Sequence, residues 1–193
     1  TSYSAFGEPV TAFEKFPNEF PTSPYAEKVS NYLVEVYMNT RSYEAALKSI
    51  ERIAKPSAQI MEAKQKILFQ LGTQSFANAN FEQALQYLNQ SITIGQYNRQ
   101  TKADAYYWCG ESYYRLNRMM EAARDFNAYL QLTTQPNNEM YALANYNLGY
   151  IAFHRKDYTQ ASNYFQKYIQ LEKGENRTAL ADAYNRIGDC HLN

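Results

Sequence analysis

The 193-residue chain has little of what most catalytic and metal sites are built from. It contains two cysteines, two histidines and one tryptophan. Neither His154 nor His191 has a Cys, Asp or Glu at helical ligand spacing, apart from the Asp189-Cys190-His191 run, in which adjacent residues of a helix point apart. No glycine-rich phosphate loop, nucleophile elbow or HExxH motif occurs. We therefore expect no catalytic residues, no metal and no cofactor, and a protein that is not an enzyme.

Net charge and long apolar runs are also lacking. The chain carries 19 basic and 19 acidic residues without a run of like charge, so we expect no binding to nucleic acid. No stretch of about 18 apolar residues is present, and we expect no direct insertion into a membrane. Cys109 and Cys190 lie too far apart along the sequence pattern described below to form a disulfide, which leaves the cellular compartment open.

Glycine is scarce, with seven residues, yet four of them are regularly spaced. Gly72, Gly110, Gly149 and Gly188 are 38, 39 and 39 residues apart, each inside a run that otherwise predicts a helix. A glycine inside a helix costs about 1 kcal/mol relative to alanine. Its return in every unit predicts that a neighbouring helix needs the space, and the spacing indicates tandem helical repeats.

Alanine follows the same period. Ala46, Ala84, Ala122 and Ala161 are 38, 38 and 39 residues apart, each 12 residues after a glycine or, for Ala46, after Val34. Between the glycine and the alanine of each unit the spacing of apolar residues changes phase, which predicts a pair of antiparallel helices in each unit. The first helix of each expected pair covers 30–38, 65–77, 103–116 or 142–154. The second helices are one that begins at Tyr43, followed by 81–94, 119–132 and 158–171.

The ends of the chain continue the pattern. Residues 10–16 resemble a last helical turn stopped by Pro17, and 182–188 mirror 104–110. We expect three segments: a partial preceding repeat and turn at 1–26, the repeat array at 27–180, and the first helix of a truncated fifth repeat at 181–193. The chain is expected to be a segment of a longer protein. The predicted fold is an all-α, right-handed superhelical solenoid of about four repeats with partial units at both ends.

The pattern resembles the tetratricopeptide repeat (TPR), whose first helix has a large residue at position 4, Leu at 7, Gly or Ala at 8 and Tyr at 11, followed by Ala at 20 and an aromatic residue at 24. The third unit fits this template with Tyr106, Cys109, Gly110, Tyr113, Ala122 and Phe126. The fourth departs from it with Asn145 and Ala152, and the first has Val34 in place of glycine. The resemblance implies a scaffold for protein–protein interaction.

Residues 13–16 and 19–26 are similar to bacterial cell-envelope TPR proteins of the Tol-Pal coordinator and outer-membrane-assembly lipoprotein type. Together with 19 tyrosines, this similarity implies an envelope protein from a Bacteroidetes-like bacterium. We expect it to be periplasmic or outer-membrane-associated, with a cytoplasmic location as the alternative.

The resemblance also implies where a partner binds, because the inner face of a TPR array is formed by the first helix of each pair. The residues at inner positions are rich in aromatic side chains, which offer rigid contact area. The groove predicted to bind a protein or peptide comprises Phe69, Thr73, Phe76, Tyr107, Glu111, Tyr114, Arg115, Tyr146, Tyr150, Phe153 and His154. Tyr107, Tyr114, Tyr146 and Tyr150 are expected to carry most of the binding energy.

Three alternatives stay open at this point. The aromatic side chains fill space between helices instead of lining a groove, or the array binds a glycan or peptidoglycan, or it is the sensory module of a larger regulatory protein. A groove of the carboxylate-clamp kind is not expected, because position 5 carries Asn31, Phe69, Tyr107 and Tyr146 where that clamp needs lysine. Lys66, Arg115 and Arg186 are expected to be solvated charges. The sequence leaves the oligomeric state open.

Overall fold

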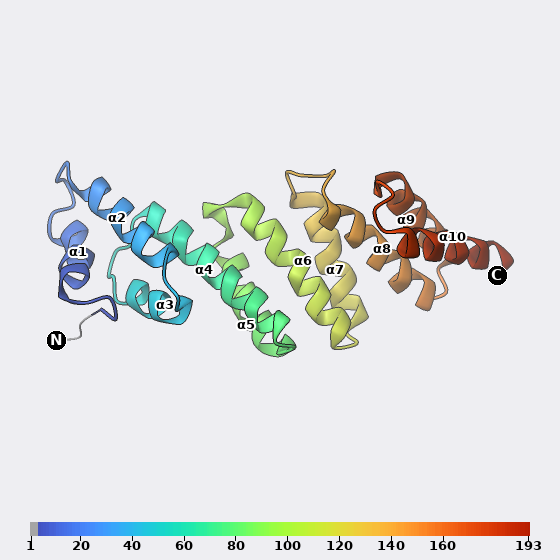
Figure 1. The fold of residues 1–193 in the computed structure, drawn as a ribbon, viewed down its shortest axis with the longest axis horizontal. Helices are drawn as coiled ribbons and strands as arrows, with labels where there is room; N and C mark the ends of the chain where they lie inside the picture. Colours follow the sequence, from blue (N-terminus) through green and yellow to red (C-terminus); the bar gives the residue numbers. More distant parts are fainter. Residues whose placement is uncertain (1–3) are drawn as a thin grey trace. The chain divides into compact units, whose positions relative to one another are not determined.

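The computed structural model describes residues 4–193, which form ten α-helices, one short 3₁₀ helix and no strand. Figure 1 shows the helices in chain order. Their bounds are α1 Glu8–Glu19, α2 Ala26–Met38, α3 Tyr43–Glu51, α4 Ala58–Ala77, α5 Phe81–Thr93, η1 Gly95–Tyr97, α6 Arg99–Arg115, α7 Met119–Leu132, α8 Glu139–His154, α9 Tyr158–Leu171 and α10 Arg177–Leu192. The predicted all-α fold of helix pairs is confirmed.

The helices group into two compact units. The first runs to Lys102 and contains α1 to α5, η1 and the first turn of α6. The second runs from Ala103 to Asn193 and contains the rest of α6 and α7 to α10. The division into 1–26, 27–180 and 181–193, and the right-handed superhelical course of the array, stay predictions.

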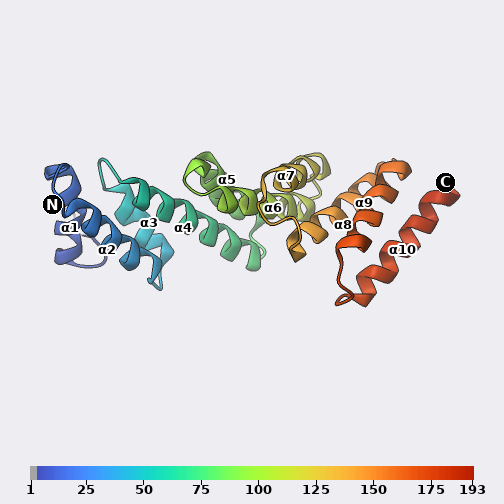
Figure 2. The same ribbon diagram turned by 90° about the horizontal axis from the view of Figure 1, so that it is seen from above.

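The tight turns of the α4–α5, α6–α7 and α8–α9 pairs are built in the same way. Ala79, Asn117 and Lys156 have φ of 59°, 60° and 62°, the left-handed conformation that ends a helix. The amide of the next residue, three positions beyond the end of the helix, then donates back across the turn, as from Arg118 N to Tyr113 O at 2.8 Å. Because this geometry recurs at the period of 38 to 39, the chain reverses at the same point in three pairs. Figure 2 shows the resulting antiparallel arrangement of α8 and α9.

The close packing predicted from the glycine spacing is confirmed at Gly72, Gly110 and Gly149 but not at Gly188, where an added methyl group would meet no atom within 4 Å. A methyl group placed on Gly110 would lie 2.8 Å from the ring of Phe126, and one on Gly149 would lie 2.7 Å from Cε1 of Phe165. Both distances are shorter than a carbon–carbon contact allows. Glycine therefore lets the second helix of the pair pack directly on the backbone of the first.

Three local predictions need correction. Helix α1 does not stop at Pro17 but continues to Glu19, because the amide of Phe20 still donates to Phe16 O at 2.9 Å across the proline. Helix α4 begins at Ala58, seven residues before the expected 65, where the Ser57 side chain accepts from Ile60 N. Residues 95–97, which lie beyond the expected helix 81–94, form η1.

Each unit has its own hydrophobic core. The first core contains Leu33, Tyr37, Ile50, Ile60 and Ile67, all fully buried. It also includes a polar cluster in which the Tyr37 hydroxyl donates to Glu14 Oε1 at 2.6 Å and Arg52 Nη2 donates to Glu14 Oε2 at 3.0 Å. This cluster joins α1, α2 and the end of α3.

The second unit buries aromatic side chains between α8, α9 and α10. Phe165 and Tyr168 of α9 are fully buried and pack with Ala161, Ala183 and Cys190. Aromatic residues of α8 cover this cluster from one side. The core of the second unit therefore lies directly beneath part of the predicted groove.

Candidate functional site

The predicted groove residues of the first unit lie on α4. Phe69, Thr73 and Phe76 are all half-buried. The Thr73 hydroxyl donates to Gln70 O at 3.1 Å, and the Phe76 ring packs edge-on against Phe81 of α5 with centroids 5.2 Å apart. Phe76 thus serves partly to close its own helix pair.

Tyr107 of α6 is an interior side chain. It is 3% exposed, and its ring packs on Phe126 and Tyr129 of α7 at centroid distances of 5.7 and 5.4 Å. Burial raises the pKa of its hydroxyl far above the ordinary value, and the neighbouring Glu111 carboxylate adds to this rise. Tyr107 presents almost no surface to a partner, so the expectation that it carries binding energy by direct contact does not hold.

Glu111 connects two first helices of successive pairs. Its Oε1 accepts from the Tyr107 hydroxyl at 3.0 Å and from Asn147 Nδ2 of α8 at 2.7 Å. One turn further along α6, Tyr114 is half-buried, with a pKa raised by burial, and Arg115 is exposed. The end of α6 thus offers an aromatic ring and a cation beside each other.

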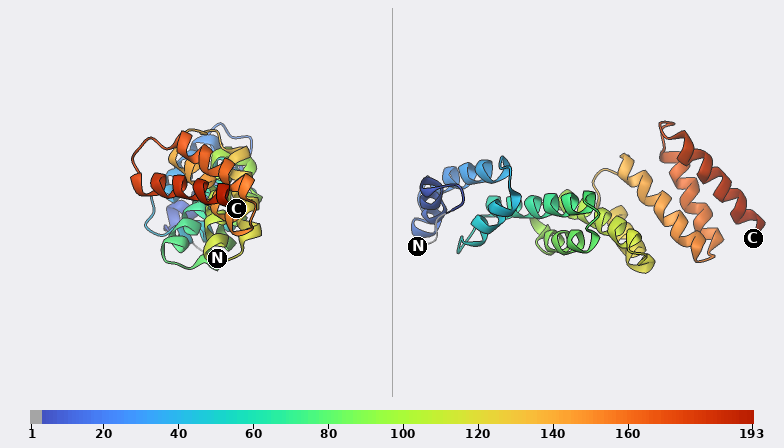
Figure 3. Two further views of the ribbon diagram at one scale, coloured as in Figure 1. Left: turned by 90° about the vertical axis from the view of Figure 1, so that its right-hand side faces the viewer. Right: turned by 60° about the horizontal axis from the view of Figure 1, so that its bottom comes forward.

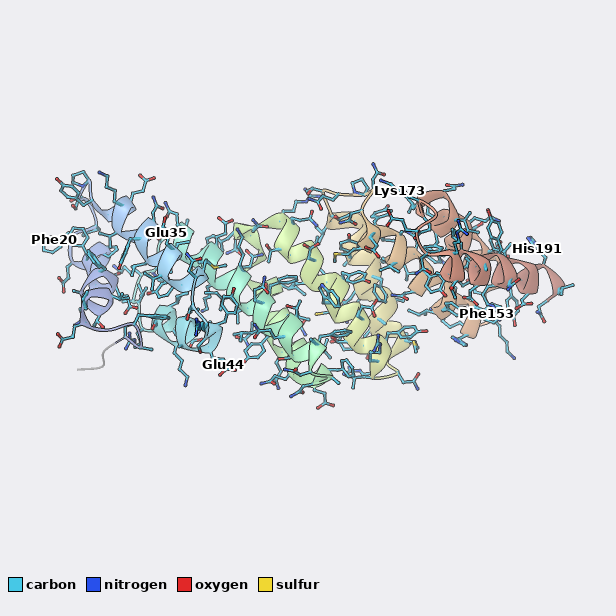
Figure 4. All side chains as sticks on the ribbon, viewed as in Figure 1. Phe20, Glu35, Glu44, Phe153, Lys173 and His191 are labelled. Atoms are coloured by element: carbon cyan, nitrogen blue, oxygen red, sulfur yellow. The ribbon has the colours of Figure 1, made fainter. Side chains whose placement is uncertain are left out.

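Four predicted residues follow one another along α8, and we call Tyr146, Tyr150, Phe153 and His154 the α8 stripe. Tyr146, Tyr150 and Phe153 are half-buried, whereas His154 is exposed. The rings form a series of close contacts: Tyr146 to Tyr150 at 5.2 Å, Tyr150 to His154 at 6.2 Å and Phe153 to His154 at 6.2 Å. Figure 4 labels Phe153 among the side chains of this unit. The structure therefore brings these four residues together on one surface.

The two tyrosines of the α8 stripe also hold α10 in place. The Tyr146 hydroxyl donates to Asp182 Oδ2 at 2.7 Å, and the Tyr150 hydroxyl donates to the same oxygen. Burial and then the Asp182 carboxylate raise the pKa of both hydroxyls. On the other side the two rings contact Phe165 of α9 at 6.0 and 5.2 Å. These rings fill space between helices, as one of the alternatives proposed, and present only part of their surface.

Arg186 of α10 completes the surface beside the stripe. Its guanidinium lies 5.9 Å from the Phe153 ring centroid, and it pairs with Asp189 at 3.0 Å and more loosely with Asp182 at 3.6 Å. Arg186 was expected as a solvated charge, but it is half-buried and takes part in these contacts.

Sequence reasoning missed Asp182 and Asn147 as members of this surface. A sequence signal for them does exist, because three side-chain hydrogen bonds join residues that are 36 positions apart, slightly less than one repeat. These bonds are Glu62–Asn98, Glu111–Asn147 and Tyr146–Asp182. Two of these bonds join successive first helices, and the third joins α4 to Asn98, the residue before α6.

Residues 4–193 offer little chemistry for catalysis or metal binding. Cys109 is fully buried, and burial raises the pKa of its thiol far above the ordinary value, which makes it a poor nucleophile. That part of the chain holds no group of three or more His, Cys, Asp or Glu side chains able to bind a metal ion. None of its helices combines the length and apolar character needed to cross a bilayer.

A pocket of about 440 Å³ lies away from the α8 stripe, at the opposite end of α8. Its lining comes from 137–139, Ala142 and 171–173 with 175–176. It is polar, but Glu172 is already satisfied by Tyr168 and by the amides of Glu175 and Asn176. This pocket contains none of the predicted groove residues.

Comparisons with known proteins agree with the helix-pair architecture. Residues 142–174, which contain most of α8 and all of α9, match the tetratricopeptide repeat family. No match is found among curated proteins.

Solved structures with a similar fold include a MamA protein, with a TM-score of 0.56, 17% identity and coverage of 88% of this chain and 83% of that one. BtubC from P. vanneervenii has a TM-score of 0.61 at 13% identity, with coverage of 95% and 79%. A MamA segment from Desulfovibrio magneticus RS-1 has a TM-score of 0.50 at 15% identity, with coverage of 86% and 94%. At these identities the likeness concerns the fold alone. The chain is thus an all-α protein with a TPR-like helical repeat fold, and its α8–α9 pair matches the tetratricopeptide repeat.

Proposed function

We propose that the chain is a non-catalytic scaffold that binds a segment of a partner protein at the α8 stripe and the neighbouring end of α6. Tetratricopeptide repeats generally bind protein partners. The observation that carries the proposal is the ring series of the α8 stripe, which ends at the exposed His154 inside the matched repeat. Rigid rings give contact area with little loss of conformational entropy.

The chemistry beside the rings favours a segment with both apolar and polar side chains. Arg115 and His154 are exposed, while Glu111 and Asp182 are half-buried acceptors. A partner would place apolar side chains on Tyr114 and Phe153 and direct polar groups to these four side chains. Apolar burial contributes about 25 cal/mol per Å² before the costs of ordering, so a few rings can supply most of the affinity.

The test compares capture of partners from a native extract by the wild-type chain and by a Tyr114→Ala/His154→Ala variant. These two positions are chosen because they lack the hydroxyl bonds by which Tyr146 and Tyr150 hold α10. The proposal predicts a loss of capture of about tenfold or more, with unchanged helical circular dichroism. Tyr25→Ala is the matched control, because Tyr25 is 62% exposed in the first unit and its replacement should leave capture unchanged. Equal capture by the double variant would contradict the proposal.

Calorimetry with peptidoglycan fragments and oligosaccharides provides a second arm. A surface built for protein segments should give no heat with sugars. Saturable heat that disappears in the Tyr114→Ala/His154→Ala variant would favour the glycan-binding alternative and overturn the proposed partner class.

We also propose that the protein functions in a bacterial cell envelope, periplasmic or outer-membrane-associated. The support is the similarity of residues 13–16 and 19–26 to envelope TPR proteins of the Tol-Pal coordinator and outer-membrane-assembly lipoprotein type. Fractionation of cells that produce the native protein tests this location, and recovery in the cytoplasmic fraction alone would contradict it.

A further inference from the structure

The carboxylates of the three 36-residue hydrogen bonds differ in whether a cation accompanies them. Glu62 of α4 lies 3.2 Å from Lys66 Nζ, and Asp182 of α10 lies 3.6 Å from Arg186 Nε, and in both cases the cation is four positions further along the same helix. The third carboxylate, Glu111 of α6, forms no ion pair within residues 4–193. Its negative charge therefore has no partner of opposite sign in the described part of the chain.

Glu111 is held in place by neutral groups and keeps one oxygen accessible. Its Oε1 accepts from the Tyr107 hydroxyl at 3.0 Å and from Asn147 Nδ2 of α8 at 2.7 Å. No other hydrogen bond within residues 4–193 reaches this half-buried side chain, and its Oε2 is not one of their buried unpaired atoms. Oε2 can therefore accept from a ligand without displacing either bond.

An aromatic ring lies beside this carboxylate. Tyr114 follows Glu111 by three positions on α6, which makes the two side chains neighbours on one face of the helix. Burial raises the pKa of the Tyr114 hydroxyl, and the Glu111 carboxylate raises this pKa further, as expected for groups that lie close together. Tyr114 is half-buried. A ligand that reaches Oε2 of Glu111 can therefore also contact this ring.

The second unit already combines arginine with rings and carboxylates. Figure 3 (right) shows α8 in orange and α10 in red within this unit. Arg186 of α10 lies 5.9 Å from the ring centroid of Phe153 of α8 while it pairs with Asp182. Arg118 lies 4.9 Å from the ring centroid of Tyr113. A guanidinium can make both contacts at once, because it is planar, stacks on rings and carries five N–H donors.

We propose that the partner segment places an arginine side chain against Glu111, with its guanidinium donating to Oε2 and stacking on the Tyr114 ring. This inference rests on the proposed function, because it assigns a residue type of the bound segment to the same surface. Lysine would match the charge but lacks a planar group for the ring. Arg115 opposes a nearby cation, but it is exposed, so water and salt screen its charge.

The test uses the full chain and immobilised hexapeptide mixtures that differ in one fixed central residue, which is Arg, Lys, citrulline, Gln or Glu. The other positions are random and uncharged. Citrulline is the matched control peptide residue, because it has nearly the shape of arginine without its charge. We expect the arginine mixture to retain the labelled chain about fivefold more strongly than the citrulline mixture, and we expect high salt to reduce this difference.

Glu111→Gln removes the charge and keeps a side-chain oxygen that can accept from Tyr107 and Asn147. The arginine and citrulline mixtures should then retain the variant equally, whereas retention on the citrulline mixture should match that of the wild type. Glu175→Gln is the control, since it removes the same charge at an exposed position of the loop before α10 and should leave the arginine preference unchanged. Circular dichroism and urea denaturation check that both variants stay folded.

Tyr114→Leu provides a second variant that keeps the carboxylate. It should abolish the preference for arginine over lysine, because the ring is lost, while both mixtures still retain the chain more strongly than citrulline does. A wild-type chain that retains lysine and arginine equally would overturn the stacked guanidinium. An arginine preference that persists in Glu111→Gln would overturn the assignment of Glu111.

The remaining outcomes separate this inference from the proposed function. Equal retention of the wild-type chain on all mixtures, lost in the Tyr114→Ala/His154→Ala variant, would reject the arginine site and leave the peptide-binding surface in place. Strongest retention on the glutamate mixture would also reject it, in favour of an acidic segment directed at Arg115 and His154. Absence of retention on every mixture would contradict both proposals.

Discussion

The same substitution, glycine to alanine, should have opposite effects at Gly149 and Gly188. These residues occupy equivalent positions of α8 and α10, and alanine gains about 1 kcal/mol of helix propensity at either site. At Gly149 the new methyl group would lie 2.7 to 2.9 Å from three ring atoms of Phe165, which is fully buried. At Gly188 no atom lies within 4 Å.

The magnitudes follow from overpacking. Inserting a methyl group into a packed core costs about 1–3 kcal/mol. The contact at Gly149 belongs at the upper end of this range, because the ring cannot move into free space. Gly149→Ala should therefore lower the free energy of unfolding by about 1–2 kcal/mol after the propensity gain is subtracted. Gly188→Ala should instead stabilise α10 by up to about 1 kcal/mol.

Urea denaturation followed by circular dichroism measures the loss at Gly149. Hydrogen exchange of the α10 amides measures the gain at Gly188, since exchange reports the local opening of a single helix. Phe165→Leu combined with Gly149→Ala should recover part of the lost stability by removing ring atoms. If Gly149→Ala were neutral or stabilising, close packing would not explain the periodic glycines.

Three further predictions concern buried polar groups. Burial raises the pKa of Tyr168 to about 12 from an ordinary value of 10. The contribution of this hydroxyl to stability is therefore complete below pH 10 and is lost as the pH rises through 12. Between pH 10 and 12 the free energy of unfolding, measured by urea titration, should fall by about 2–3 kcal/mol less in Tyr168→Phe than in the wild type. Burial also raises the pKa of Asp125, despite Arg124 beside it. Because the charged form is disfavoured in the fold, Asp125→Asn should raise the free energy of unfolding by about 1 kcal/mol at pH 7 and by less at pH 4. A loss of stability at pH 7 would contradict this. Arg52→Ala leaves the Glu14 carboxylate, which is 6% exposed, without its cation and should lower the free energy of unfolding by about 3 kcal/mol. The Glu14→Gln/Arg52→Ala double variant should lose less, because no buried charge remains. Equal losses of stability in thermal melts of the two variants would mean that Glu14 and Arg52 are not coupled.

The helix pairs were predictable because their signals are local and repeat. Gly110 and Gly149 mark the first helix, Ala122 and Ala161 mark the second, and the expected helix 158–171 matches the observed bounds of α9. Helix starts were less predictable. Caps such as Ser57 extend α4 beyond the apolar pattern, and Pro17 interrupts one hydrogen bond of α1 without ending the helix.

The exposure of the aromatic side chains was not predictable from position alone. Tyr107 and Tyr146 share one template position, yet Tyr107 is buried and Tyr146 is half-buried. The two rings have the same size and pack on equivalent neighbours of the second helix, Phe126 with Tyr129 and Phe165 with Tyr168, so neither property predicts the difference. The acceptor for the tyrosine hydroxyls, Asp182, lies on α10, two helices beyond α8, and only the three-dimensional contact reveals it.

Hydrogen exchange of the chain with and without its captured partner tests the proposed function most directly. The account predicts slower exchange in the last turns of α6 and α8, around Tyr114 and His154, with little change in α7 and α9. Protection confined to α7 and α9 would place the partner on the second helices and contradict the assignment of the α8 stripe.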